Sequence, residues 1–269
     1  MKTRAITGFF FVLIMLAALL LGQLVFIGFF FFLSLFCLDE FYRLVRTDEV
    51  RPLRVAGIAL GLSVLIPLSL KHLADAGDTV FLAVVPFTVF ICLMALYRKE
   101  PKPFHSVAYT ILGVVMTVLP FCFYISSAFI DGSYNFHISL GFLLLLWASD
   151  TGAYLSGRKF GKHKLFERHS PKKTWEGFLG GLFFSLLVAF LLGIFYTELS
   201  FAIWASVSFI VVVFGTFGDL FESMLKRSLS VKDSGNILPG HGGLLDRFDG
   251  LLLSAPLVFV LLYLTFNYF

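Results

Sequence analysis

Charged residues are scarce in this chain. Asp, Glu, Lys and Arg make up 14% of its 269 residues, whereas soluble domains carry roughly 25%. Hydrophobic residues make up 58%, and 35 residues are phenylalanine. The shortage of charge excludes an ordinary soluble domain and predicts an integral membrane protein. The net charge of +4 gives no reason to expect a nucleic-acid partner.

Cysteine and the common catalytic motifs are also lacking. Cys37, Cys92 and Cys122 are widely spaced within apolar runs, and no metal-binding CxxC occurs. The sequence has no GxxxxGK[ST], no HExxH and no GxSxG. These absences argue against a P-loop NTPase, a zinc protease and a serine hydrolase.

The apolar runs are long enough to cross a bilayer, which takes roughly 20 residues per helix. They are continuously apolar rather than alternating, so they predict helices and not a barrel. The first run, from Ala5 to Leu38, is too long for a signal peptide and predicts a helical hairpin. We therefore expect an all-α polytopic membrane protein with about nine spans. They lie at about 5–21, 23–40, 55–70, 79–97, 106–127, 138–157, 174–196, 200–218 and 251–267.

The distribution of basic residues predicts the orientation. With the N-terminus in the cytoplasm, all of the 21 lysines and arginines except Lys71 fall on the cytoplasmic side. This favours a cytoplasmic N-terminus and an extracytoplasmic C-terminus; an even number of spans, through a re-entrant first hairpin, is the main alternative. We divide the chain into N-terminal membrane helices, 1–135, and a C-terminal catalytic region, 136–269. The polar loops of that region, 158–173 and 219–250, then share the cytoplasmic face.

Acidic residues lie at the ends of the apolar runs. Asp150 follows LLLLWAS, Asp219 ends a span, and Asp246 and Asp249 precede LLLSAPLVF. A carboxylate inside the bilayer costs at least ~2.5 kcal/mol, so acids here suggest function. Hydration at the interface is the alternative, as is a stabilising N-terminal helical turn for Asp246 and Asp249. Three residues apart, these two share one helix face, where they suit Mg²⁺ together with Asp219.

Basic residues occur in adjacent pairs beside these acids. Such pairs either form a surface patch for anionic lipid or bind phosphate. The glycine-rich PGHGG should bring backbone N–H groups toward an anion, and its His241 either donates to phosphate or stabilises the turn. The pairs are Arg158 and Lys159, Lys172 and Lys173, and Lys226 and Arg227.

The stretch from Ser223 to Asp249 resembles the signature of the phosphatidate cytidylyltransferases, the CDP-diacylglycerol synthases. It carries that pattern without a departure, and the upstream SDTGAYLSGRKFGKHKLFERHSPKKTWEGFLGG is similar to the family as well. The resemblance covers the C-terminal half of the chain. The matching residues are Ser223, Lys226, Arg227, Lys232, Asp233, Gly235, Leu238, Pro239, His241, Gly242, Gly243, Asp246, Arg247 and Asp249.

The resemblance implies a nucleotidyltransferase that converts CTP and phosphatidic acid to CDP-diacylglycerol and pyrophosphate with Mg²⁺. It leaves open a second cation such as K⁺ and a homodimer. Because the second pKa of a phosphate monoester is about 6, phosphatidate is already a nucleophile at pH 7. Catalysis must then come from positioning and charge neutralisation rather than from a general base.

The resemblance, weighed with this chemistry, assigns roles to individual residues. Asp219, Asp246 and Asp249 hold Mg²⁺, and Asp150 completes the metal site or pairs with a cation. The cations that neutralise the triphosphate or phosphatidate are Lys226, Arg227, Lys232 and Arg247. Ser223 and the turn Gly240, His241, Gly242 and Gly243 shape the phosphate pocket. Arg158, Lys172 and Lys173 meet the lipid phosphate.

The lipid substrate and the competing functions give further expectations. Acyl chains leave the bilayer at a cost of ~0.8 kcal/mol per CH₂, so we expect a cleft between spans, open to the membrane at its cytoplasmic side. A polyprenol or dolichol kinase and a transporter are alternatives. A CDP-alcohol phosphotransferase is disfavoured, because its DG…AR…G…D…D pattern is not found. The short N-terminus favours a bacterial inner membrane.

Overall fold

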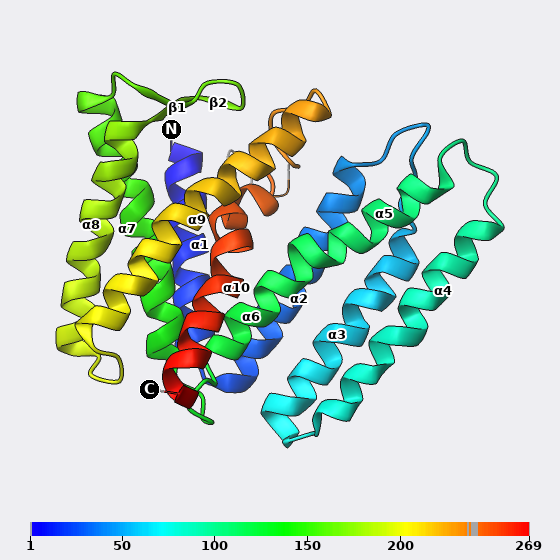
Figure 1. The fold of residues 1–269 in the computed structure, drawn as a ribbon, viewed down its shortest axis with the longest axis horizontal. Coiled ribbons are helices and arrows are strands. Elements are labelled where there is room, and N and C mark those ends of the chain that lie inside the picture. Colours follow the sequence, from blue (N-terminus) through cyan, green and yellow to red (C-terminus); the bar gives the residue numbers. More distant parts are fainter. Residues whose placement is uncertain (1, 236, 238–241, 269) are drawn as a thin grey trace. The chain divides into compact units, whose positions relative to one another are not determined.

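The structure is a computed structural model that describes the backbone of residues 2–235, 237 and 242–268 (Figure 1). Side chains are described from Ile6 onward. Its first part contains α1 (Lys2–Leu20), α2 (Gln23–Leu44), α3 (Arg54–Ala74), the 3-10 helix η1 (Asp78–Ala83), α4 (Val84–Leu96), α5 (Pro103–Gly113), the π-helical turn η2 (Val114–Val118) and α6 (Leu119–Ser127). There follow α7 (Phe136–Phe160), β1 (Lys164–Phe166), β2 (Ser170–Thr174), α8 (Trp175–Phe195), α9 (Phe201–Ser228) and α10 (Leu245–Tyr268).

The expectation of an all-α membrane protein is confirmed. In the described residues, 8 helical segments are long and apolar enough to cross a membrane, and Ile6–Leu20 in α1 is a shorter apolar helix. Two of the 8 are composite: η1 continues into α4, and α5 continues through η2 into α6. The orientation of the termini stays a prediction.

The chain folds into two compact units. The first unit comprises Met1–Ile125 and Asp233–Leu245, and the second comprises Ser126–Lys232 and Asp246–Phe269. A short stretch of the family signature therefore belongs to the first unit, although its neighbours on both sides in the sequence belong to the second.

Aromatic side chains form part of the core of the first unit. Phe26, Phe30 and Tyr124 are fully buried and stack edge to face, with ring centroids 5.0 Å apart for the two phenylalanines and 4.8 Å for Phe30 and Tyr124. Tyr42 is also buried, and its hydroxyl donates to the carbonyl of Thr110 at 2.6 Å. These contacts join α2 to α5 and α6 inside an apolar core.

Small residues let α7 and α8 approach closely in the second unit. A Cβ added at Gly152 would lie 2.8 Å from the carbonyl oxygen of Gly180, so neither position has room for a larger residue. Such small-residue contacts drive helix packing in membranes, where burial of apolar surface adds little. Ser185 adds a polar tie from α8, donating to the carbonyl of Leu145 at 3.2 Å and accepting from Ser208 at 2.8 Å. The packing holds α7 and α8 side by side.

The loop expected at 158–173 contains a small antiparallel hairpin of β1 and β2. Glu176, in the first turn of α8, accepts from the backbone N–H of Lys162 at 3.1 Å and contacts Nδ1 of His163 at 2.6 Å. Thr174 caps α8 by accepting from the N–H of Gly177 at 3.2 Å. Glu176 therefore orders the hairpin.

The second polar loop is shorter than the expected 219–250. Helix α9 continues to Ser228, ten residues past the expected end of its span, and α10 begins at Leu245. Glu222 and Lys226 pair four residues apart in this extension, and Lys226 and Arg227 lie in its last turn, where basic charge stabilises a helix.

Candidate functional site

A cavity of about 590 Å³ lies in the second unit, between α7, the hairpin, α8, α9 and the start of α10. Its apolar lining includes Leu146, Phe178 and Val211. Its charged lining consists of Asp150, Arg158, Lys172, Lys173, Asp219, Asp246, Arg247 and Asp249. The fold thus brings together all four predicted metal-ligating acids and four of the predicted cations.

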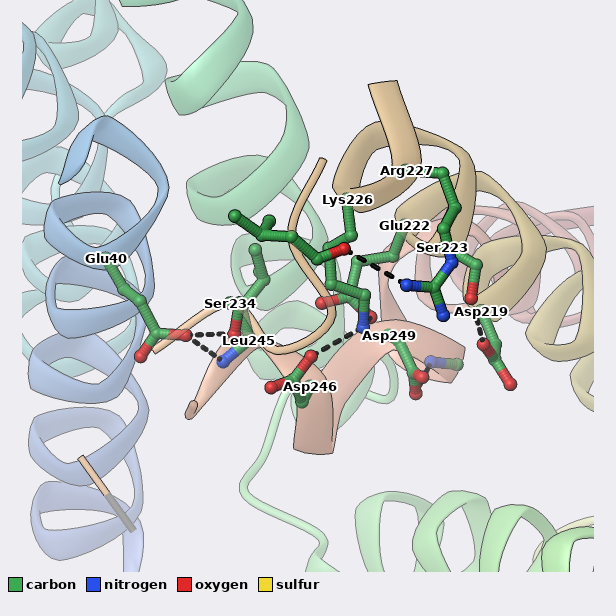
Figure 2. A network of polar contacts seen from close by, with 12 residues as sticks. Glu40, Asp219, Glu222, Ser223, Lys226, Arg227, Ser234, Leu245, Asp246 and Asp249 are labelled. Atoms are coloured by element: carbon green, nitrogen blue, oxygen red, sulfur yellow. Dashed lines mark hydrogen bonds and ion pairs between the residues drawn. The ribbon is translucent and has the colours of Figure 1, made fainter. Parts of the chain in front are cut away.

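Asp219 is held from both sides in this cavity. Its Oδ2 lies 2.6 Å from Nζ of Lys173. Its Oδ1 accepts from the hydroxyl of Ser223, one turn further along α9, at 3.1 Å (Figure 2). Lys173 also donates to the carbonyl of Thr216 at 3.3 Å. Both side chains are part-exposed and line the cavity.

Lys226, predicted to neutralise phosphate charge, does not line this cavity. It is almost completely buried and donates to Oδ1 of Asp246 at 2.6 Å, and its Nζ lies 3.3 Å from Oε2 of Glu222 (Figure 2). A buried cation between two carboxylates is committed to them, because removing it would leave charge uncompensated in a low-dielectric interior. Lys226 thus holds α9 against the start of α10 rather than lining the cavity.

Glu222 is a site residue that the sequence reasoning missed. Its side chain is only 1% exposed, and its ion pair with Lys226 is longer than the one that Lys226 makes with Asp246. It lies within electrostatic range of Asp246 and Asp249 as well as Lys226. Its position four residues before Lys226 is the signal that could have identified the pair.

Asp150 and Asp249 complete the charged lining. Oδ1 of Asp249 accepts from the N–H of Gly250 at 2.6 Å, and its charge is repelled by Asp219 and Asp150. Asp150 is in turn attracted by Lys173 and Arg247. Asp150, Asp219 and Asp249 therefore repel one another electrostatically while Lys173 and Arg247 offset part of that charge, and a bound cation would lower the repulsion further.

The residues fit a magnesium ion by their chemistry. In the described part of the chain no three His, Cys, Asp or Glu side chains form a ready-made metal cluster. Mg²⁺ does not need one, since it usually takes one or two carboxylates and completes its shell with water and substrate phosphate. The acidic residues that line the cavity are all aspartates, and carboxylate oxygen is a kind of ligand that Mg²⁺ prefers.

Two further predicted cations of the second unit, Arg227 and Lys232, do not line this cavity. Arg227 donates to the carbonyl of Val231 at 3.2 Å, and Lys232 is exposed on the following turn. Gly242, with φ of 82°, and Gly243 belong to the first unit. Gly240 and His241 lie outside the described residues, so their predicted role at a phosphate is untested.

A buried acid that was not predicted holds the signature segment within the first unit. Glu40, on α2, is 3% exposed and accepts from the hydroxyl of Ser234 and, at 3.2 Å, from the N–H of Leu245 (Figure 2). It also accepts from the N–H of Leu244 at 2.9 Å. A Cβ at Gly243 would collide with its carboxylate. One reason for a glycine here is therefore close packing against Glu40.

Fold and cavity define a class: a polytopic membrane protein whose interior site suits polyanionic phosphate substrates. Residues 2–265 match the model of the cytidylyltransferase family. The chain is 36% identical over 265 residues to a phosphatidate cytidylyltransferase of Staphylococcus haemolyticus (strain JCSC1435), covering 97% of this chain and 99% of the relative. The proteins of the same name from Staphylococcus aureus (strain COL) and Staphylococcus saprophyticus are 34% and 35% identical, with the same coverage. The chain belongs to the cytidylyltransferase family.

Proposed function

We propose that this protein is a phosphatidate cytidylyltransferase, which transfers the cytidylyl group of CTP to phosphatidic acid. The observation that carries the proposal is the meeting of carboxylates, basic side chains and an apolar wall in one cavity between candidate membrane spans. One substrate is a polyanion, which suits the charged lining residues. The other is an anionic lipid, which suits the charged and the apolar lining residues together. The full-length similarity to relatives of this name supports the same activity.

The reaction joins two anions. An oxygen of the phosphatidic acid phosphate attacks the α-phosphorus of CTP, and the bond from that phosphorus to the oxygen bridging to the β-phosphorus breaks. Pyrophosphate leaves with the bonding electrons. No proton has to be removed from the nucleophile, because a phosphate monoester is largely dianionic at pH 7. The protein must instead align the groups and neutralise their charge.

The basic lining residues are suited to that neutralisation. Lys173 and Arg247, which balance the acids of the cavity, would bind the triphosphate. Arg158 and Lys172 would hold the lipid phosphate, beside the apolar lining that takes the first carbons of the acyl chains. The candidate ligands for Mg²⁺, which would neutralise the triphosphate charge when bound, are Asp150, Asp219, Asp246 and Asp249.

The finer assignments rest on the resemblance and on charge. We propose a bacterial inner membrane location with the cavity open to the cytoplasm, supported by the basic residues gathered on one side of the spans. A second cation such as K⁺ and a homodimer stay predictions.

Turnover by the purified full-length protein tests the proposal. In detergent micelles containing phosphatidic acid, with CTP and Mg²⁺, we expect CDP-diacylglycerol and pyrophosphate in equal amounts. Asp249→Asn keeps the shape of the side chain but removes its charge, and should lower the rate at least about 100-fold, the usual scale for loss of a group that stabilises the transition state. Asp131→Asn, at an exposed turn of the same unit, is the matched control and should match the unmodified protein.

Two results would contradict this account. A folded preparation that forms no CDP-diacylglycerol would overturn the function. An Asp249→Asn variant with near-normal turnover would leave the function in place but remove the role assigned to this acid.

A further inference from the structure

A second cavity, of about 430 Å³, lies in the first unit and is lined by five arginines. They are Arg43, Arg46, Arg51, Arg54 and Arg98. The rest of the lining is Tyr42, Pro52, Leu53, Val55, Ala56 and Met94. None of these residues lines the cavity of the second unit, and nothing in the proposed reaction uses them.

The arginines lie where three candidate membrane spans end. Arg43 is in the last turn of α2, Arg54 is the first residue of α3, and Arg98 follows the end of α4 at Leu96. Ends of adjacent spans mark the level at which hydrocarbon gives way to lipid headgroups. Val55, 84% exposed, and Met94, 40% exposed, form an apolar rim on the span side. The cavity is therefore expected at headgroup depth, with an apolar wall toward the lipid chains.

The cavity is held in shape by contacts of its own. Asp39 pairs with Arg54 and, at 2.6 Å, with Arg43, and so fixes two guanidinium groups relative to each other. The loop between α2 and α3 is tied to α5: the N–H of Arg51 donates to Ser106 at 2.9 Å, and that of Leu53 donates to Thr110 at 2.8 Å. A polar surface patch that formed only to orient the chain in the membrane would not require these ties.

Positive charge in the cavity exceeds the acid that balances it. Asp39 forms ion pairs with Arg43 and Arg54, and Glu100 forms an ion pair with Arg98 at 3.3 Å. The loop acid Glu49 pairs with Lys102 instead, and the hydrogen bond from that lysine lowers the pKa of Glu49. Arg46 and Arg51 have no acidic partner among the described residues.

We propose that this cavity binds the phosphate of an anionic glycerophospholipid. Guanidinium groups bind phosphate through paired, planar hydrogen bonds, and they do so better than lysine. The volume exceeds that of a phosphate and accommodates a glycerol phosphate headgroup. The site would hold a lipid at the membrane surface independently of turnover, so it stands whether or not the proposed function holds.

Native mass spectrometry of the full-length protein in detergent tests the site. The probes are dioctanoyl phosphatidylglycerol, dioctanoyl phosphatidylcholine and inorganic phosphate. The variant is Arg46→Gln with Arg51→Gln, which removes the two arginines without an acidic partner. The matched control is Lys99→Gln with Lys164→Gln, which removes two charges from exposed positions outside both cavities. Circular dichroism checks that each protein is folded.

We expect phosphatidylglycerol to bind the Arg46→Gln, Arg51→Gln protein at least tenfold more weakly than the unmodified protein or the control, and phosphatidylcholine to bind all three alike. Equal losses in variant and control would mean diffuse attraction to the surface and would overturn the site. No loss in either would overturn it too. Binding of inorganic phosphate that depends on the two arginines, without such binding of phosphatidylglycerol, would overturn the lipid assignment.

Discussion

Replacing Glu40 with alanine should destabilise the protein strongly, although Glu40 does not line the cavity of the second unit. Three donors converge on its buried carboxylate: the hydroxyl of Ser234 and the N–H groups of Leu244 and Leu245. Hydrogen bonds to a charged group contribute about 1.5–3 kcal/mol each, and a buried donor left unpaired carries a penalty of its own. Because neighbouring contacts are not additive, we expect a loss of about 4 kcal/mol in total.

The chain supplies a control at the preceding position. Asp39 is on the same helix, but its partners Arg43 and Arg54 are 67% and 52% exposed. Exposed ion pairs contribute about 0–1 kcal/mol, so Asp39→Ala should change stability little. Glu40→Gln keeps the acceptor for Ser234 and Leu245 but turns an amide group toward the N–H of Leu244. We expect it to fall between the two, with a loss of about 1–2 kcal/mol.

Reversible unfolding in mixed micelles measures these differences, and limited proteolysis of the 233–245 segment reports where the structure loosens. The expected order of stability is the unmodified protein, then Asp39→Ala, then Glu40→Gln, then Glu40→Ala. If Glu40→Ala lay within about 1 kcal/mol of the unmodified protein, or if Asp39→Ala lost as much, the role assigned to Glu40 would be refuted.

Two further predictions concern the second unit. Lys226→Met should lower the free energy of unfolding by about 3–5 kcal/mol, because Asp246 and Glu222 then lack their buried counter-charge. Unfolding in mixed micelles measures this loss, and an unchanged free energy of unfolding would contradict the pairing. Gly152→Leu should separate α7 from α8 at Gly180 and lower the melting temperature. The control Phe183→Leu, at an exposed position of α8, should leave the melting temperature unchanged. If the two variants melted at the same temperature, the close approach of the helices would be contradicted.

Hydropathy predicted the helices because a membrane span needs a long apolar run whatever its partners are. It placed the end of α9 too early, because the Glu222–Lys226 pair lets the helix continue through charged residues. The hairpin at 164–174 was not predicted, since strands of three and five residues carry little pattern. The orientation of the spans was predicted from the distribution of basic residues alone and stays a prediction.

Charge at the ends of spans identified the acids of the cavity, but not their partners. The sequence did not indicate that Lys226 pairs with two carboxylates, Glu222 one turn earlier on α9 and Asp246 on α10, and its predicted role at a phosphate stays a prediction. Glu40 was missed because its donors come from a segment about 200 residues away and two of them are backbone N–H groups. A sequence does not show which backbone N–H groups will donate to a distant side chain.

The fate of the phosphates of CTP tests the central claim most directly. The full-length protein is incubated with phosphatidic acid, Mg²⁺ and CTP radiolabelled at either the α- or the γ-phosphorus, and the lipid is extracted. A cytidylyltransferase puts the α-label into lipid and the γ-label into pyrophosphate, and this is the result that we predict. A γ-label in the lipid fraction would identify a kinase and contradict the account.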